Sequence, residues 1–104
     1  MKATSVSISD AAASDIVEQA DWYDAQSGRS LAARWEKAVT SAILRIVKAP
    51  AAGTPCSFGS AELHYVRRTT IAGFPKHLIF YRFSEGEVFV LRVVHGARDL
   101  ERLL

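Results

Sequence analysis

Apolar residues recur at three- and four-residue steps in two stretches of the first half of the chain, residues 10–25 and 30–48. This spacing predicts two amphipathic helices, each with one apolar stripe. Ser9 or the adjacent Asp10 can cap the first helix, and Pro50 ends the second. A linker of three or four residues predicts an antiparallel αα-hairpin. The stripes contain Ala12, Ala13, Ile16, Val17, Ala20 and Tyr23, then Leu31, Trp35, Ala38, Val39, Ala42, Ile43 and Ile46.

The rest of the chain contains the segments that favour strands. Residues 3–8 alternate apolar and polar side chains, which is typical of a short strand with one apolar side. Residues 63–70, 76–83 and 87–95 are rich in β-branched and aromatic residues. The last two runs flank a turn that contains glycine, which predicts a β-hairpin.

Residues 49–62 are rich in Pro, Gly and Ser and are predicted as a loop, whereas residues 98–104 are predicted as a short final helix. The expected fold is therefore α+β with the order β-α-α-β-β-β(-α), in one domain over residues 1–104. An antiparallel-rich sheet carries the αα-hairpin packed on one face. No element remains to cover the other face, which is partly apolar, and we expect a partner to bind there.

The turn at residues 84–86 decides which side chains share a face of the sheet. In a three-residue loop Phe83 pairs with Glu87, which places Arg82 and Arg92 together on the face away from the helices. In a two-residue turn the register slips by one. The three-residue loop is preferred because it collects both arginines on the open face. On the same open face this register places Leu78, Phe80, Val88, Val90 and Val94. Toward the helices it places Ile79, Tyr81, Phe83, Phe89, Leu91 and Val93.

Composition narrows the class of protein. The chain has 104 residues, of which 49% are hydrophobic and 23% charged, as in ordinary globular domains. No apolar run is long enough to span a membrane, and no secretory leader is expected at the N-terminus. Cys56 is expected to be a free thiol in a reducing cytoplasm. No cluster of cysteine and histidine residues has the spacing of a zinc site, and no glycine-rich phosphate-binding loop is present. No metal and no cofactor are therefore expected.

Positive charge is concentrated in the second part of the chain. Residues 63–104 carry seven Lys/Arg and four Asp/Glu, and all three histidines lie in this part. Residues 1–62 carry six Lys/Arg and seven Asp/Glu. A basic sheet surface suits either nucleic acid or an acidic protein. The candidate contact residues for a target or a partner are Arg67, Arg68, Arg82, Arg92, His95 and Arg98.

Three segments carry a more specific pattern. Residues 66–75 read Val-Arg-Arg-Thr-Thr-Ile-Ala-Gly-Phe-Pro, residues 78–82 read Leu-Ile-Phe-Tyr-Arg, and residues 91–99 read Leu-Arg-Val-Val-His-Gly-Ala-Arg-Asp. With the two predicted helices before them, their order and spacing resemble the RelE/ParE superfamily of bacterial type II toxins. The resemblance covers nearly the whole chain.

The resemblance implies a small cytoplasmic toxin that an antitoxin protein neutralises by wrapping it with a flexible C-terminal segment. It implies one of two targets: DNA gyrase, which ParE-like members stall, or mRNA on the ribosome, which RelE-like members cut. Promoter DNA would be bound only through the antitoxin. We expect an amphipathic, acidic antitoxin segment that masks Arg67, Arg82, Arg92 and Arg98.

The ParE-like branch is preferred over the RelE-like branch. RNA cleavage needs a base, cationic groups at the phosphate and a proton donor. The tail after Asp99 has no Tyr, Leu78 stands where some RelE-like members carry Arg, and residues 54–62 hold no Lys. His95 and Arg98 remain as acid and phosphate clamp in that alternative; otherwise both have structural roles. A third hypothesis is a degenerate, non-toxic member that only binds an antitoxin.

Overall fold

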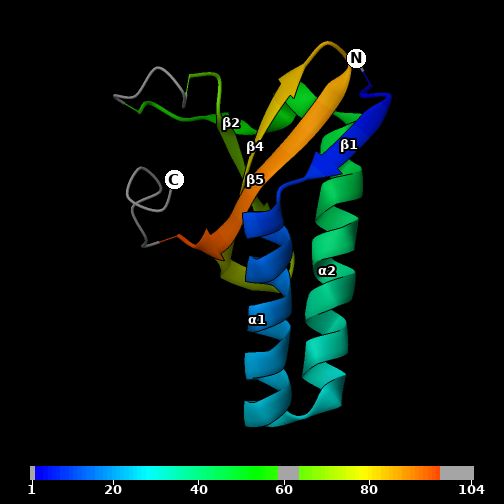
Figure 1. The fold of residues 1–104 in the computed structure, drawn as a ribbon, viewed down its shortest axis with the longest axis vertical. Coiled ribbons are helices and arrows are strands. Elements are labelled where there is room, and N and C mark those ends of the chain that lie inside the picture. Colours follow the sequence, from blue (N-terminus) through cyan, green and yellow to red (C-terminus); the bar gives the residue numbers. More distant parts are fainter. Residues whose placement is uncertain (1, 59–63, 97–104) are drawn as a thin grey trace.

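Two antiparallel helices lie along one face of a five-stranded sheet in the computed structural model, which describes residues 2–58 and 64–96 (Figure 1). The α+β class predicted from the sequence is confirmed. No helix within these two ranges is both long and apolar enough to cross a membrane. The elements are β1 (Ser5–Ile8), α1 (Asp10–Ser27), α2 (Arg29–Lys48), the 3-10 turn η1 (Pro50–Ala52), β2 (Thr54–Pro55), β3 (Arg67–Ile71), β4 (Phe74–Ser84) and β5 (Glu87–His95).

The sheet has the strand order β1-β5-β4-β3-β2. β1 runs parallel to β5, and the other neighbouring strands are antiparallel. The predicted loop over 49–62 is wrong at Thr54–Pro55, because these two residues form β2 and pair with Arg68 and Arg67. β3 begins at Arg67, later than the predicted strand over 63–70. The predicted final helix over 98–104 lies outside the described residues.

One glycine joins the two helices. α1 ends at Ser27 and α2 begins at Arg29, so the predicted linker of three or four residues is wrong. Gly28 adopts φ 90°, a left-handed value that glycine adopts without a steric penalty, and its N–H donates to the Asp24 carbonyl. At the other end of α1, the Ser9 side chain accepts the Ala12 N–H, as expected of an N-cap.

The β4–β5 hairpin turns through two residues rather than three. Ser84 pairs with Glu87, and Glu85 and Gly86 between them both have positive φ, 50° and 80°. The preferred three-residue register is therefore wrong near the turn. The side chains of Val88 and Val90 face the helices there, and both residues are buried.

A β-bulge corrects this slip further along the hairpin. Tyr81 pairs with Val90 but Phe80 pairs with Arg92, so β5 has an extra residue at Leu91. Arg82 and Arg92 therefore lie on the same face of the sheet, as predicted. Phe89 and Leu91 also belong to the side away from the helices, which corrects their predicted placement.

The main core lies between the helices and the sheet. Trp35 is fully buried in it, and its indole N–H donates to the Ile16 carbonyl at 3.1 Å. Trp22, in contrast, is 56% exposed. The largest fully buried side chains of this core are Trp35, Tyr81, Ile71, Ile79, Val88 and Val90.

A second, smaller cluster lies on the opposite face, which the sequence predicted to be uncovered. Val66, Phe80 and Val94 are buried there. Cys56 and Phe58, from the segment after β2, pack against them. The expectation of an open apolar face is therefore only partly correct, because this segment closes part of it.

Candidate functional site

The candidate arginines fall into two groups once their contacts are known. Arg67 faces the helix side, opposite Tyr81 in the β3–β4 pairing. One of its terminal nitrogens donates to the Ala51 carbonyl at 3.1 Å and to the Gly53 carbonyl at 2.8 Å. Arg67 therefore fixes the segment that links α2 to β2.

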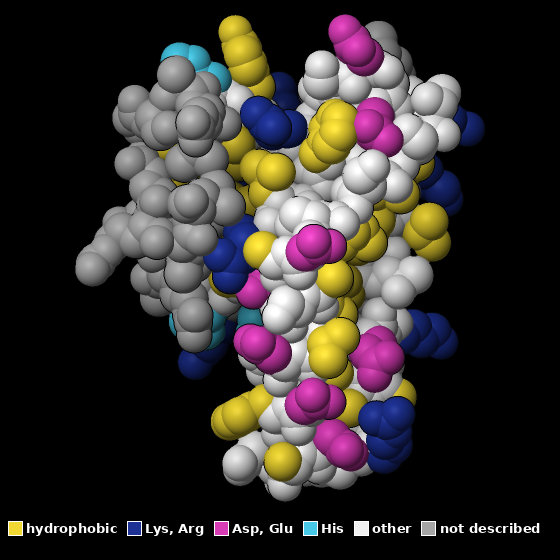
Figure 2. Space-filling model, viewed as in Figure 1, with side chains coloured by type: hydrophobic (Ala, Val, Ile, Leu, Met, Phe, Trp, Pro, Cys, Tyr) yellow, Lys and Arg dark blue, Asp and Glu magenta, His cyan; other side chains and the backbone are white. Residues whose placement is uncertain are grey.

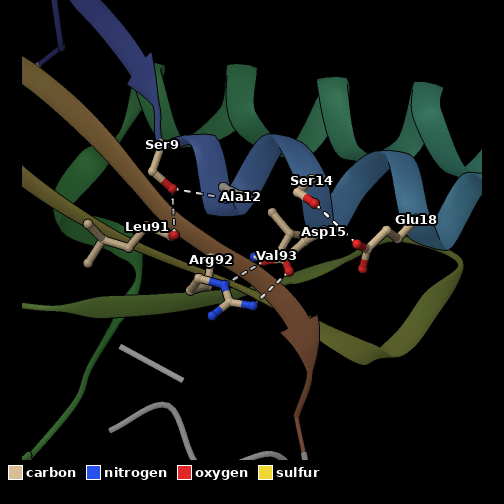
Figure 3. A network of polar contacts seen from close by, with 8 residues as sticks. All are labelled: Ser9, Ala12, Ser14, Asp15, Glu18, Leu91, Arg92 and Val93. Carbon is tan, nitrogen blue, oxygen red and sulfur yellow. Dashed lines mark hydrogen bonds and ion pairs between the residues drawn. The ribbon is translucent and has the colours of Figure 1, made fainter. Parts of the chain in front are cut away.

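Arg92 is bound to α1 by a bidentate ion pair with Asp15 (Figure 3). Arg92 Nε lies 2.8 Å from Asp15 Oδ2, and the second guanidinium contact to Oδ1 is also 2.8 Å. The two side chains are only 12% and 11% exposed. The hydrogen bond to Asp15 raises the pKa of Arg92. The guanidinium thus turns toward α1 instead of projecting from the open face.

The same carboxylate stabilises the edge of β5. β1 pairs with β5 only as far as Val90, which leaves the following residues of β5 without a neighbouring strand on that side. Ser9 Oγ donates to the Leu91 carbonyl at 2.8 Å, and Val93 N–H donates to Asp15 Oδ2 at 3.0 Å (Figure 3). Side chains at and near the start of α1 therefore replace the missing strand.

Arg68 and Arg82 lie on the face of the sheet away from the helices. Arg68 is opposite Phe80 and is exposed, whereas Arg82 is opposite Phe89 and is half-buried. A pocket of about 300 Å³ includes Arg82 and Phe89 together with Tyr65. We call Tyr65, Arg68, Arg82 and Phe89 the open-face patch.

Tyr65, like Phe89, belongs to this patch although the sequence analysis did not single it out as a contact residue. Its side chain is 87% exposed, and its φ of 65° is a left-handed value that is unfavourable for a residue with a Cβ. Unfavourable backbone conformations of this kind cluster at functional sites, so Tyr65 is a candidate contact residue. The only indication in the sequence is its position directly before Val66-Arg67-Arg68.

His95 lies at the end of β5, beside a groove between α1 and the sheet. The groove has a volume of about 600 Å³. We call it the α1 groove. It is lined by Asp15, Glu18, Gln19, Trp22, Tyr23, His77, Val93, Val94 and His95.

Two histidines meet across the sheet at this groove. His77 pairs with His95 in the β4–β5 ladder, and their ring centroids are 5.8 Å apart. The His77 ring also packs edge-on against Trp35 at 4.8 Å, and the residue is 8% exposed. Burial, and secondarily the neighbouring His95, lower the pKa of His77, so this imidazole is neutral at pH 7.

We expect stability to fall as the pH drops below the unfolded-state pKa of histidine, about 6.5. The unfolded chain binds a proton at His77 more readily than the folded chain does, so acid favours unfolding at up to about 1.4 kcal/mol per pH unit. Urea unfolding at pH 7.5 and 5.5 should show this loss in the wild type and less of it in His77→Gln. The exposed His64→Gln variant is the control, and an equal acid loss in all three proteins would refute a role for His77.

The structure describes only one of the two residues that the nuclease alternative requires. His95 is described and lies at the α1 groove, whereas Arg98 lies outside the described residues, so the structure does not place the proposed acid and phosphate clamp together.

Cys56 is a free cysteine. It is half-buried, its sulfur lies 3.8 Å from the Thr54 carbonyl oxygen, and burial raises the pKa of its thiol. Within residues 2–58 and 64–96, no three His, Cys, Asp or Glu side chains are grouped to hold a metal ion.

Comparison with known proteins supplies an independent observation. A family model described as "ParE toxin of type II toxin-antitoxin system, parDE" matches residues 6–100. None of the curated proteins matches the chain in sequence. The fold is similar to a solved structure described as "Chromosomal ParDE TA system from P. aeruginosa". The TM-score is 0.72 and the sequence identity 18%, over 88% of this chain and 94% of that chain.

Proposed function

The chain belongs to the ParE family of type II toxins, and from this premise we propose that it inhibits DNA gyrase and is neutralised by a cognate antitoxin. The family match over residues 6–100 is the observation that carries the proposal. Gyrase is preferred to the ribosome because the match is to ParE and because the described residues offer arginine and aromatic contacts rather than an assembled acid–base site. The proposed place of action is the cytoplasm.

The open-face patch is the proposed contact with gyrase. Tyr and Arg are the side chains that most often dominate protein interfaces, since each buries a large area and still forms hydrogen bonds. Arg68 and Arg82 lie on the same sheet face, with Tyr65 and Phe89 beside Arg82. Arg67 and Arg92 bind groups on the segment after α2 and on α1, and they are proposed to support the fold.

The activity is tested by incubating the purified chain with gyrase in one assay and with ribosomes programmed with mRNA in another. We expect loss of supercoiling while the mRNA remains intact. Cleavage of the mRNA at the ribosomal A site would contradict the gyrase proposal and select the nuclease alternative. Normal growth of bacteria that express the folded chain alone would favour a non-toxic, antitoxin-binding protein.

Replacing Arg82 by alanine should reduce inhibition of gyrase by tenfold or more, because truncation of a hot-spot residue at an interface costs about 2 kcal/mol or more and arginine is enriched among hot spots. Supercoiling titrations of wild type, Arg82→Ala and the matched control Arg34→Ala would measure the change. Arg34 is exposed on α2, away from the open-face patch. Equal inhibition by all three folded proteins would exclude Arg82 from the contact.

The antitoxin is proposed to cover the same patch. Arg68, and Arg82 on the same face, would favour an acidic segment, as the concentration of basic residues in 63–104 already indicates. Arg67 and Arg92 are not needed for this masking, since their guanidinium groups already bind Gly53 and Asp15. In the complex, Arg68 and Arg82 should therefore be protected from chemical modification of arginine, rather than Arg67 and Arg92.

A further inference from the structure

The α1 groove is acidic, unlike the rest of the proposed binding surface. Helix α1 contains no Lys or Arg, and its acidic side chains repeat along the helix (Figure 2). Asp15 is already neutralised by Arg92. Glu18 lines the groove, and its one hydrogen bond within the described residues comes from Ser14 Oγ at 3.2 Å (Figure 3). The charge of Glu18 also acts on Arg92, but the ion pair of Arg92 is with Asp15, so the Glu18 carboxylate can accept a ligand's hydrogen bonds.

His77 provides a second polar group in the same groove. It is more than nine-tenths buried, it lines the groove, and no hydrogen bond to its side chain exists within the described part of the chain. Its neighbours there are the rings of Trp35 and His95. A neutral imidazole has one nitrogen that accepts a hydrogen bond. A donor entering the groove would supply a hydrogen-bond partner that this ring lacks within the described residues.

Trp22 supplies an aromatic wall. Its indole is 56% exposed and packs edge-to-face on Tyr23, with ring centroids 5.5 Å apart. Aromatic faces of this kind attract cations, and tryptophan does so most strongly. The groove thus combines one carboxylate, one buried acceptor and an exposed indole.

We propose that the α1 groove binds an arginine side chain of the antitoxin. The guanidinium group stacks on Trp22 and donates hydrogen bonds to Glu18 and His77. Arginine fits better than lysine because its planar group stacks on a ring and offers five donors in a fixed arrangement. The choice of the antitoxin as the source of this side chain rests on the proposed function.

Occupancy of the groove would add a second contact to the antitoxin complex. His95 lines the groove on the helix side of the sheet, the side opposite the open-face patch. The antitoxin would carry one basic anchor for the α1 groove beside an acidic segment for the open-face patch.

The arginine site is tested first with a small probe on the full-length chain. N-acetyl-arginine amide should shift the NMR signals of the Trp22 indole and the His77 ring in a saturable way. N-acetyl-citrulline amide, which has the same shape but no charge, should bind at least fivefold more weakly. Equal shifts with both probes would overturn the proposal.

Variants of α1 locate the effect. Glu18→Gln should weaken binding of the arginine probe at least fivefold, because it removes the charge that faces the guanidinium. Asp21→Asn makes the same change on an α1 residue that does not line the groove, and it should leave the affinity unchanged. Retained affinity in Glu18→Gln would refute the assignment.

A second measurement identifies the partner. The product of the reading frame adjacent to the toxin should bind Glu18→Gln at least tenfold more weakly than wild type, with gyrase inhibition by the free toxin unchanged. If the probe binds but this affinity does not change, the antitoxin is not the source of the arginine. Failure of gyrase inhibition with normal probe binding would instead reject the proposed function and leave the arginine site in place.

Discussion

Replacing Asp15 by alanine should lower the free energy of unfolding by about 3–5 kcal/mol, the range seen when one partner of a buried ion pair is removed. The variant leaves Arg92 without its bidentate partner and leaves the Val93 N–H without an acceptor at the edge of β5. Both groups are mostly removed from water, since the Arg92 side chain is 12% exposed. Urea unfolding followed by circular dichroism measures the loss.

Asp21→Ala is the matched control for this prediction. It removes a carboxylate from an exposed position of the same helix, so we expect a change within about 0.5 kcal/mol. A loss below about 1 kcal/mol in Asp15→Ala would mean that the ion pair does not hold α1 against the sheet.

Replacing Gly53 by alanine should be similarly damaging, at about 3 kcal/mol or more, because the site is already filled. A Cβ atom at this position would lie 2.1 Å from the Tyr81 hydroxyl oxygen and 2.8 Å from the adjacent ring carbon. That hydroxyl is fixed, since it donates to the Pro50 carbonyl at 2.7 Å and accepts the Gly53 N–H at 3.1 Å. Either the Tyr81 ring or η1 has to move, and buried hydrogen bonds are lost.

Gly28→Ala separates this steric effect from the general cost of replacing glycine. Position 28 has no atom within 4 Å of the added Cβ, but its φ of 90° and ψ of 174° are essentially restricted to glycine, so a backbone penalty of about 1–3 kcal/mol is expected. Thermal unfolding of both variants tests the difference. A Gly53→Ala variant that is within about 1 kcal/mol of the wild type would contradict the close packing of Tyr81 on this segment.

Local patterns were sufficient to predict the long elements. The two helices, predicted over 10–25 and 30–48, form at Asp10–Ser27 and Arg29–Lys48, because apolar side chains at helical spacing and strong end signals agree there. The last strand has the predicted bounds, Glu87–His95. β2 was missed because two residues, one of them proline, are too short to show any periodicity.

The hairpin register depended on information that the local sequence does not contain. Glu85 adopts a positive φ, which is unusual for glutamate and permits the two-residue turn. The bulge at Leu91 then restores the shared face of Arg82 and Arg92. That face was therefore predicted correctly from a turn that was predicted wrongly.

The candidate site was less accessible to sequence reasoning. Asp15 and Arg92 are 77 residues apart, and nothing in their spacing indicates that they meet. Charge and the predicted hairpin register therefore grouped Arg92 with Arg68 and Arg82, although its guanidinium is bound to α1. Tyr65 and the α1 groove depend on how separate elements pack, so they became visible only in the folded chain.

The dissociation constant of the toxin–gyrase complex tests the central claim most directly. The purified wild-type chain should bind gyrase, and Arg82→Ala should bind at least tenfold more weakly while its unfolding temperature stays the same. Absence of binding by the folded wild-type chain, or equal affinity of the two proteins, would contradict the proposal that this face of the sheet recognises gyrase.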